Sequence, residues 1–157
     1  YKPDAVGLEL PVFGAMYSEG MYGLFLFVSE ALRTKKQDVV FLSPGQIKAH
    51  ARLHLQRPPK WKMEKPDMVE AAKVCLTKGK RWNHNEADAL WAAFTAARFW
   101  GFQKGEIAES DLNEVERDQF IRSKVKKKTG EETKTGILYR EDERFFRWSE
   151  NDDDKKE

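Results

Sequence analysis

Two acidic side chains stand in apolar surroundings. Glu9 lies inside the run AVGLELPVF, and Asp88 lies between two alanines in a segment rich in apolar residues. An ionised carboxylate in such a setting is costly unless it is paired or binds a metal ion. Helical spacing places Asn85 and His84 three and four residues before Asp88, so the three side chains can share one face. Oxygen-rich clusters of this kind suit Mg²⁺ or Mn²⁺, so the pattern predicts a divalent-metal site.

Each acid also has a simpler explanation. Glu9 can belong to an edge strand and point to water. Asn85, Glu86 and Asp88 can occupy a helix N-terminus because the helix dipole favours acidic residues there. These alternatives remain open at the level of the sequence.

Two apolar runs are expected to form the strands that position Glu9. Residues 5–10 (AVGLEL) precede Pro11, which ends a strand, and residues 38–42 (DVVFL) are rich in β-branched side chains. In open α/β sheets, sites form at the carboxyl ends of the strands, where Glu9 would lie. Between the two runs, residues 19–34 repeat apolar side chains at helical spacing on two faces, which predicts a helix covered on both sides.

Further helices follow the second strand. Ser43 and Pro44 begin a helix expected to end near Ala51, and residues 52–61 then form a basic loop. Residues 66–77 predict another helix. The helix carrying Asp88 is expected to be capped by Asn83 or Asn85 and to end at Gly101. Its predicted inward residues are Leu90, Phe94 and Ala97.

The chain changes character after residue 105. Residues 106–128 predict a charged helix, and residues 136–141 and 144–148 can pair as a hairpin. Residues 151–157 predict a disordered tail. We therefore expect one domain over residues 1–105 and a charged extension over residues 106–157.

The order of elements predicts an α/β fold with parallel strands. Only two core strands are evident in residues 1–105, and two buried parallel strands are too few for a sheet. We expect the remaining strands to come from a segment before Tyr1 or from another chain.

A concentrated basic stretch runs through the middle of the chain. Residues 48–81 hold ten basic and three acidic side chains, although the whole chain has a net charge of only +2. Such a stretch suits binding to nucleic-acid phosphates. It is equally typical of a solvated helix face with a loop. No apolar run is long enough to span a membrane, and the single cysteine, Cys75, excludes an intrachain disulfide and fits a reducing cytosol.

Four segments together resemble the RuvC-like Holliday junction resolvases of bacteria and phages, which have the RNase H and retroviral-integrase type of fold. The phage-type branch looks most similar. The resemblance spans about residues 1–101, with the segments in the family's order. The matching segments are KPDAVGLE with VF at residues 2–9 and 12–13, SPGQIK at 43–48, Lys65 before MV at 68–69, and NEADAL at 85–90.

The resemblance implies an RNase H-like mixed sheet flanked by helices, incomplete at the N-terminus. It implies a crossover junction endonuclease that cuts branched DNA by hydrolysis, with two Mg²⁺ or Mn²⁺ ions about 3.5–4 Å apart. Glu9, Asp88 and Asn85 would be metal ligands, with His84 assisting catalysis. Lys48 and Lys65 match positions where the family has DNA-contacting lysines, and the basic residues between them complete the expected DNA-binding set: Arg52, Arg57, Lys60 and Lys62.

The same resemblance implies a homodimer, for which helix 19–34 is the candidate interface, and a bacterial or phage-infected host cytoplasm. It also shows two departures. The family's first strand, which carries an Asp, has no counterpart here, so a third carboxylate is expected from outside the chain. Asn85 stands where the family has an acid or His and cannot act as a base. The alternative is therefore an inactive RNase H-like protein that binds branched DNA, or a subunit of a larger nucleic-acid complex.

Overall fold

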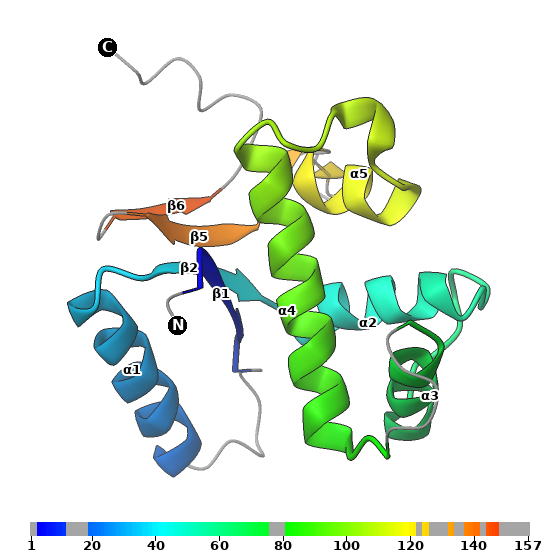
Figure 1. Cartoon of the computed structure of the whole chain (residues 1–157), viewed down its shortest axis with the longest axis horizontal. Helices are drawn as coiled ribbons and strands as arrows, with labels where there is room; N and C mark the ends of the chain where they lie inside the picture. The colour runs from blue at the N-terminus through cyan, green and yellow to red at the C-terminus, as the bar shows by residue number, and fades with distance from the viewer. Residues whose placement is uncertain are drawn as a thin grey trace.

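The computed structural model describes residues 3–11, 19–75, 81–121, 124–125, 132–133, 137–141 and 144–147. Figure 1 shows a mixed α/β arrangement that is mostly helical. The described strands are β1 (Ala5–Glu9), β2 (Asp38–Leu42), β3 (Lys124–Val125), β4 (Glu132–Thr133), β5 (Leu138–Glu141) and β6 (Arg144–Arg147). The described helices are α1 (Glu19–Thr34), α2 (Pro44–His54), α3 (Lys65–Cys75), α4 (His84–Gln103) and α5 (Glu114–Phe120), with a 3₁₀ turn η1 at Glu109–Asp111.

The two strands predicted from residues 5–10 and 38–42 form and pair in parallel, with Glu9 opposite Leu42. β5 adds to the other edge of β2 in the antiparallel sense, and β6 pairs with β5, so the strand order is β1-β2-β5-β6. The mixed sheet and the predicted hairpin are therefore confirmed. The expectation that every further strand comes from a segment before Tyr1 or from another chain is wrong, because the hairpin from the far end of this chain joins β2.

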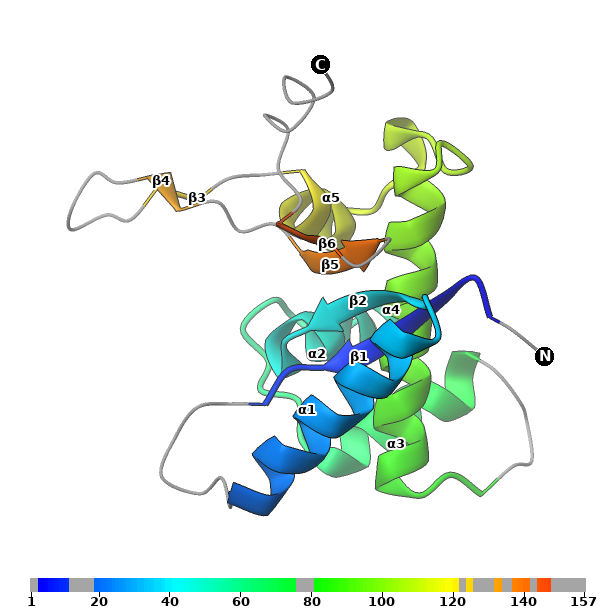
Figure 2. The ribbon, with the colours of Figure 1, turned by 90° about the vertical axis from the view of Figure 1, so that its left-hand side faces the viewer.

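The sheet lies between helices (Figure 2). α1 covers one face, and α4 packs against β1 on the opposite face. Alternate side chains of a strand point to opposite faces of the sheet. Helices cover both faces of β2, so its side chains are buried on both sides. Val40 and Leu42 join the main core, whereas the Phe41 ring meets the Phe25 ring of α1 edge-to-face at 6.1 Å.

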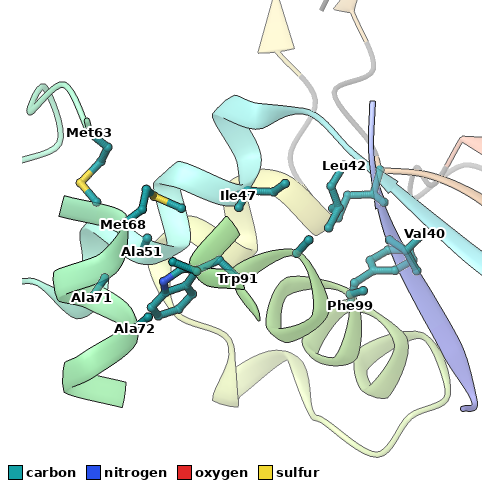
Figure 3. Packing of buried hydrophobic residues seen from close by; sticks show 14 of the residues in the cluster. Val40, Leu42, Ile47, Ala51, Met63, Met68, Ala71, Ala72, Trp91 and Phe99 are labelled. Carbon is teal, nitrogen blue, oxygen red and sulfur yellow. The ribbon is translucent and has the colours of Figure 1, made fainter. Parts of the chain in front are cut away.

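The main core fills the space between β2 and the three helices α2, α3 and α4 (Figure 3). Trp91 of α4 is 1% exposed and packs where small side chains on the neighbouring helices, Ala51, Ala71 and Ala72, leave room for it. The predicted inward face of α4 is only partly correct. Ala97 is exposed, and the helix instead buries Trp91 and Phe99 with smaller residues between them.

Side-chain caps fix where α2 and α4 begin. Ser43 caps α2 in a capping box with Gln46, and Asn83, rather than Asn85, caps α4 in the same way with Glu86. Both helices run further than predicted. α2 continues through His54, whose ring packs against Trp91, so Arg52 is helical and not in a loop. α4 continues past Gly101, where the absent side chain leaves room for Ile107.

The predicted helix over residues 106–128 is wrong. α5 covers only Glu114–Phe120, and Lys124–Val125 form a strand. Asn113 begins α5 through a capping box with Glu116. The Glu116 carboxylate is fully buried and accepts hydrogen bonds from Arg98 Nε at 2.6 Å and Nη2 at 2.9 Å, which fastens α5 to α4.

Residues beyond 105 also contribute to the core that contains α4. Leu112, Phe120 and Ile137 are buried in the same cluster as Phe99. The division at residue 105 stays a prediction of the sequence. The predicted tail at residues 151–157 lies outside the described residues, and none of the described helices is long and apolar enough to cross a membrane.

Candidate metal site

Gly7 allows α4 to pack directly against the backbone of β1. A Cβ atom at Gly7 would lie 2.5 Å from the carbonyl oxygen of Ala92 and 3.0 Å from the Cβ of Ala96. Contacts this short do not occur, so only glycine permits this approach. A glycine within a strand often marks such a close approach, and this is the signal by which the sequence could have revealed it.

The same packing sets Asp88 opposite Glu9. Glu9 lies two residues after Gly7, about 6.6 Å along the strand and on the same face. Asp88 lies four residues before Ala92, about 6 Å along the helix and also on the same face. Because α4 runs in the opposite direction to β1 (Figure 1), these two displacements lead the same way. The strand end and the first turns of the helix therefore bring the two acids together.

Glu9 is influenced electrostatically by Asp88 and by Lys48. Partial burial raises the pKa of Glu9, the negative charge of Asp88 raises it further, and the positive charge of Lys48 lowers it. Lys48 is exposed on α2, so three separate elements contribute to one site. The Glu9 side chain remains exposed, and its surroundings raise its pKa without sealing it from solvent. Asp88 is half-buried, so the acid pair is partly open to solvent.

The other two predicted site residues stand at the edge of this pair. His84 and Asn85 are exposed in the first turn of α4, one turn before Asp88. Within the described part of the chain, neither side chain makes a hydrogen bond or ion pair with Glu9 or Asp88. Helical spacing alone keeps Asn85 on the side of α4 that carries Asp88.

The charges of Glu9 and Asp88 suit a divalent cation. The negative charge of Asp88 makes ionisation of Glu9 less favourable, and a cation between the two carboxylates would remove that repulsion. Mg²⁺ commonly binds through one or two carboxylates and retains several waters. Over the described ranges, no group of three His, Cys, Asp or Glu side chains could hold a metal. The two acids thus fit one cation, and a second cation would need ligands from elsewhere.

The predicted DNA-binding residues extend from this site along α2 and into the α2–α3 loop. Lys48 and Arg52 are one helical turn apart and share a face of α2. Arg57, Lys60, Lys62 and Lys65 are all exposed beyond its end. Lys62 is paired with Glu64 at 2.9 Å, and Arg57 lies 3.7 Å from Glu70, so these two cations are partly neutralised.

The histidines among these basic residues do not add to the positive surface. His50 is fully buried, its Nε2 lies 3.2 Å from Gln119 Oε1, and its ring stacks on Phe120. Burial lowers the pKa of His50 to about 4, so the ring is neutral at pH 7. Burial also lowers the pKa of His54. Nothing in the local sequence distinguishes these packed rings from histidines that would contact phosphates.

Comparison with known protein families, with curated proteins and with solved structures gives no match. The functional assignment therefore depends on the geometry above and on the residues of the sequence.

Proposed function

We propose that this chain is a metal-dependent, structure-selective endonuclease that cuts branched DNA such as Holliday junctions, with an RNase H-like fold of the RuvC type. One observation carries the proposal: Glu9, at the carboxyl end of β1, interacts electrostatically with Asp88, in the first turns of α4, and with the cation of Lys48. The parallel β1–β2 pair covered by helices on both faces also supports it.

The reaction is hydrolysis of a phosphodiester bond. Water attacks phosphorus, the bond to the 3′ oxygen breaks, and the products carry a 3′ hydroxyl and a 5′ phosphate. Divalent cations supply charge stabilisation at the attacking and leaving oxygens when bound. Glu9 and Asp88 would hold one cation, Asn85 would add an oxygen ligand at the edge, and His84 would orient water. A third carboxylate from outside the described residues would be needed to complete a two-ion site.

Lys48 has a distinct role because it reaches both the acids and the basic surface. Its charge offsets the repulsion between the carboxylates, and it holds the phosphate next to the scissile bond. Arg52, one turn along α2, holds the following phosphates. Contacts to phosphates carry no sequence information, so this surface suits recognition of DNA shape.

Cleavage of a labelled four-way junction in Mg²⁺ tests the proposal. Purified protein in which the third carboxylate is also present is expected to nick the junction, and Glu9→Gln and Asp88→Asn are expected to abolish nicking while retaining junction binding. Asp4→Asn is the matched control, because Asp4 is an exposed acid next to the opposite end of β1. Equal cleavage by Glu9→Gln and Asp4→Asn would show that the acid pair is not the active site.

A second function is favoured by the absence of a third acidic ligand from the described residues. A non-catalytic protein with this fold would bind branched DNA through the basic surface, either alone or within a larger complex. Junction binding without nicking in either Mg²⁺ or Mn²⁺ would establish this alternative and exclude the nuclease.

We further propose that α1 forms a homodimer interface, since symmetric cutting of a junction suits two-fold symmetry. The helix exposes Leu24 (56%), Leu26 (49%) and Phe27 (72%). Analytical ultracentrifugation of wild type should give a dimer, and Phe27→Ser should shift it toward monomer. A Phe27→Ser protein that stays fully dimeric at micromolar concentration would exclude this interface.

A further inference from the structure

The α2–α3 loop presents a tryptophan at the surface. Trp61 is 45% exposed, whereas Met63, two residues later, is 3% exposed and packs in the main core. Figure 3 shows Met63 beside the start of α3, where it closes this end of the core. The core therefore does not need the Trp61 ring, and a large aromatic surface stays accessible among cations.

Hydrogen bonds and one backbone angle fix the loop on both sides of Trp61. Gln56 has a φ of 53°, which turns the chain sharply after α2. The Trp61 amide donates to the Pro58 carbonyl at 2.8 Å, and the Glu64 amide donates to Asp67 Oδ2 at 2.9 Å. With Met63 anchored in the core, the loop backbone that carries Trp61 is fixed before any ligand arrives, which reduces the entropy lost on binding.

A cation lies over the Trp61 ring. The Arg57 guanidinium carbon is 5.1 Å from the ring centroid, and Glu70 lies 3.7 Å from the same guanidinium group. A surface pair of this kind contributes little to stability. Stability alone is thus a weak reason for leaving a tryptophan exposed. A flat, electron-rich ring beside positive charges also matches the chemistry of a nucleobase attached to a phosphate.

We propose that Trp61 and Arg57 form a stacking site for an unpaired base of DNA, with Lys60 binding the adjacent phosphate. The identity of the ligand as DNA rests on the proposed function. The α2 helix rises about 9 Å between Lys48 and His54, so the stacking site and the acid pair can engage one DNA molecule. This site would favour DNA with unpaired bases near the cut over continuous duplex.

Fluorescence anisotropy of labelled DNA in EDTA, where no cleavage occurs, tests the site. The probes are a single-stranded thymine oligonucleotide and a duplex of equal length. Trp61→Ala is expected to weaken single-strand binding about 5- to 150-fold and duplex binding less than about twofold. Trp61→Phe, which keeps an aromatic ring, should recover most of the lost affinity.

Two comparison variants isolate stacking. Lys60→Ala should weaken both probes to a similar degree, because phosphate binding does not depend on base pairing. Val74→Ala truncates a side chain that is 64% exposed on α3 and should change neither affinity. Quenching of a 2-aminopurine placed in the single strand should also require an aromatic residue at position 61.

Two results would overturn the stacking site: an equal loss for both probes in Trp61→Ala, or no single-strand binding by wild type. The stacking-site proposal and the nuclease proposal can fail independently. A protein that nicks junctions but ignores Trp61 excludes only the stacking site. A protein that binds unpaired bases through Trp61 but cuts nothing excludes only the nuclease.

Discussion

Replacing Gly7 with alanine tests the packing that builds the acid pair. The new Cβ would lie 2.5 Å from Ala92 O, and this neighbour is helix backbone that no side-chain rotation can move away. Restoring an ordinary contact requires β1 and α4 to separate by about 1 Å, because non-bonded heavy atoms pack at about 3.5 Å or more. Overpacking of this kind costs about 1–3 kcal/mol.

Thermal unfolding and junction cleavage measure the two consequences. A loss of about 1–3 kcal/mol lowers Tm by about 2–12 °C in a domain of this size. Separating Glu9 from Asp88 by about 1 Å is expected to slow cleavage about 100-fold, since catalysis is sensitive to such displacements. The cleavage assay uses temperatures at which the variant is fully folded.

Gly23→Ala is the matched control for Gly7→Ala. Gly23 lies inside α1, and a Cβ there meets nothing within 4 Å. Alanine in a helix interior is better than glycine by about 0.5–1 kcal/mol, so this variant should be slightly more stable than wild type. A Gly7→Ala protein as stable as wild type would refute the close packing of β1 on α4. A destabilised variant with normal cleavage would refute the link between that packing and activity.

Three further predictions concern ionisable groups. The pKa of Glu9 is raised in the folded protein, so ionisation of Glu9 at pH 7 lowers stability. Glu9→Gln should therefore raise Tm at pH 7. This gain in Tm should disappear as the pH falls below the ordinary pKa of 4.5. An absence of gain at pH 7 would contradict the partial burial of this carboxylate. Wild type should lose up to about 3 kcal/mol in urea unfolding between pH 6.5 and pH 4, because the neutral His50 (pKa about 4) must charge on unfolding. The His50→Gln variant should show a smaller loss, and an unchanged pH profile would assign the acid sensitivity to other groups. Arg98→Ala should cost about 3 kcal/mol because it leaves the buried Glu116 unpaired. Arg33→Ala, which removes an exposed ion pair with Glu30, should cost less than about 1 kcal/mol, and equal costs would contradict the burial of the Arg98 pair.

Strands, helix starts and helix caps that depend on residues close together in the sequence were predictable from the sequence. The β-branched run at residues 38–42 forms a strand, and Ser43 with Pro44 begins α2 as expected. Asn83 and Glu86 form a capping box because the required side chains are three residues apart. Errors arose where distant contacts decide the end of an element. α2 extends because His54 packs on Trp91, and α4 passes Gly101 because Ile107 fills the space beside it.

The candidate site likewise has features set by local sequence and features set by contacts between distant residues. The sequence by itself placed Glu9 at the end of a strand and Asp88 near the start of a helix, since both positions follow from local patterns. Only the tertiary structure brought the two acids together, because their separation depends on how closely α4 approaches Gly7. It also added β5 to the edge of β2 and buried His50 among aromatic rings. Those outcomes depend on contacts between residues far apart in the chain, which no local pattern of side chains specifies.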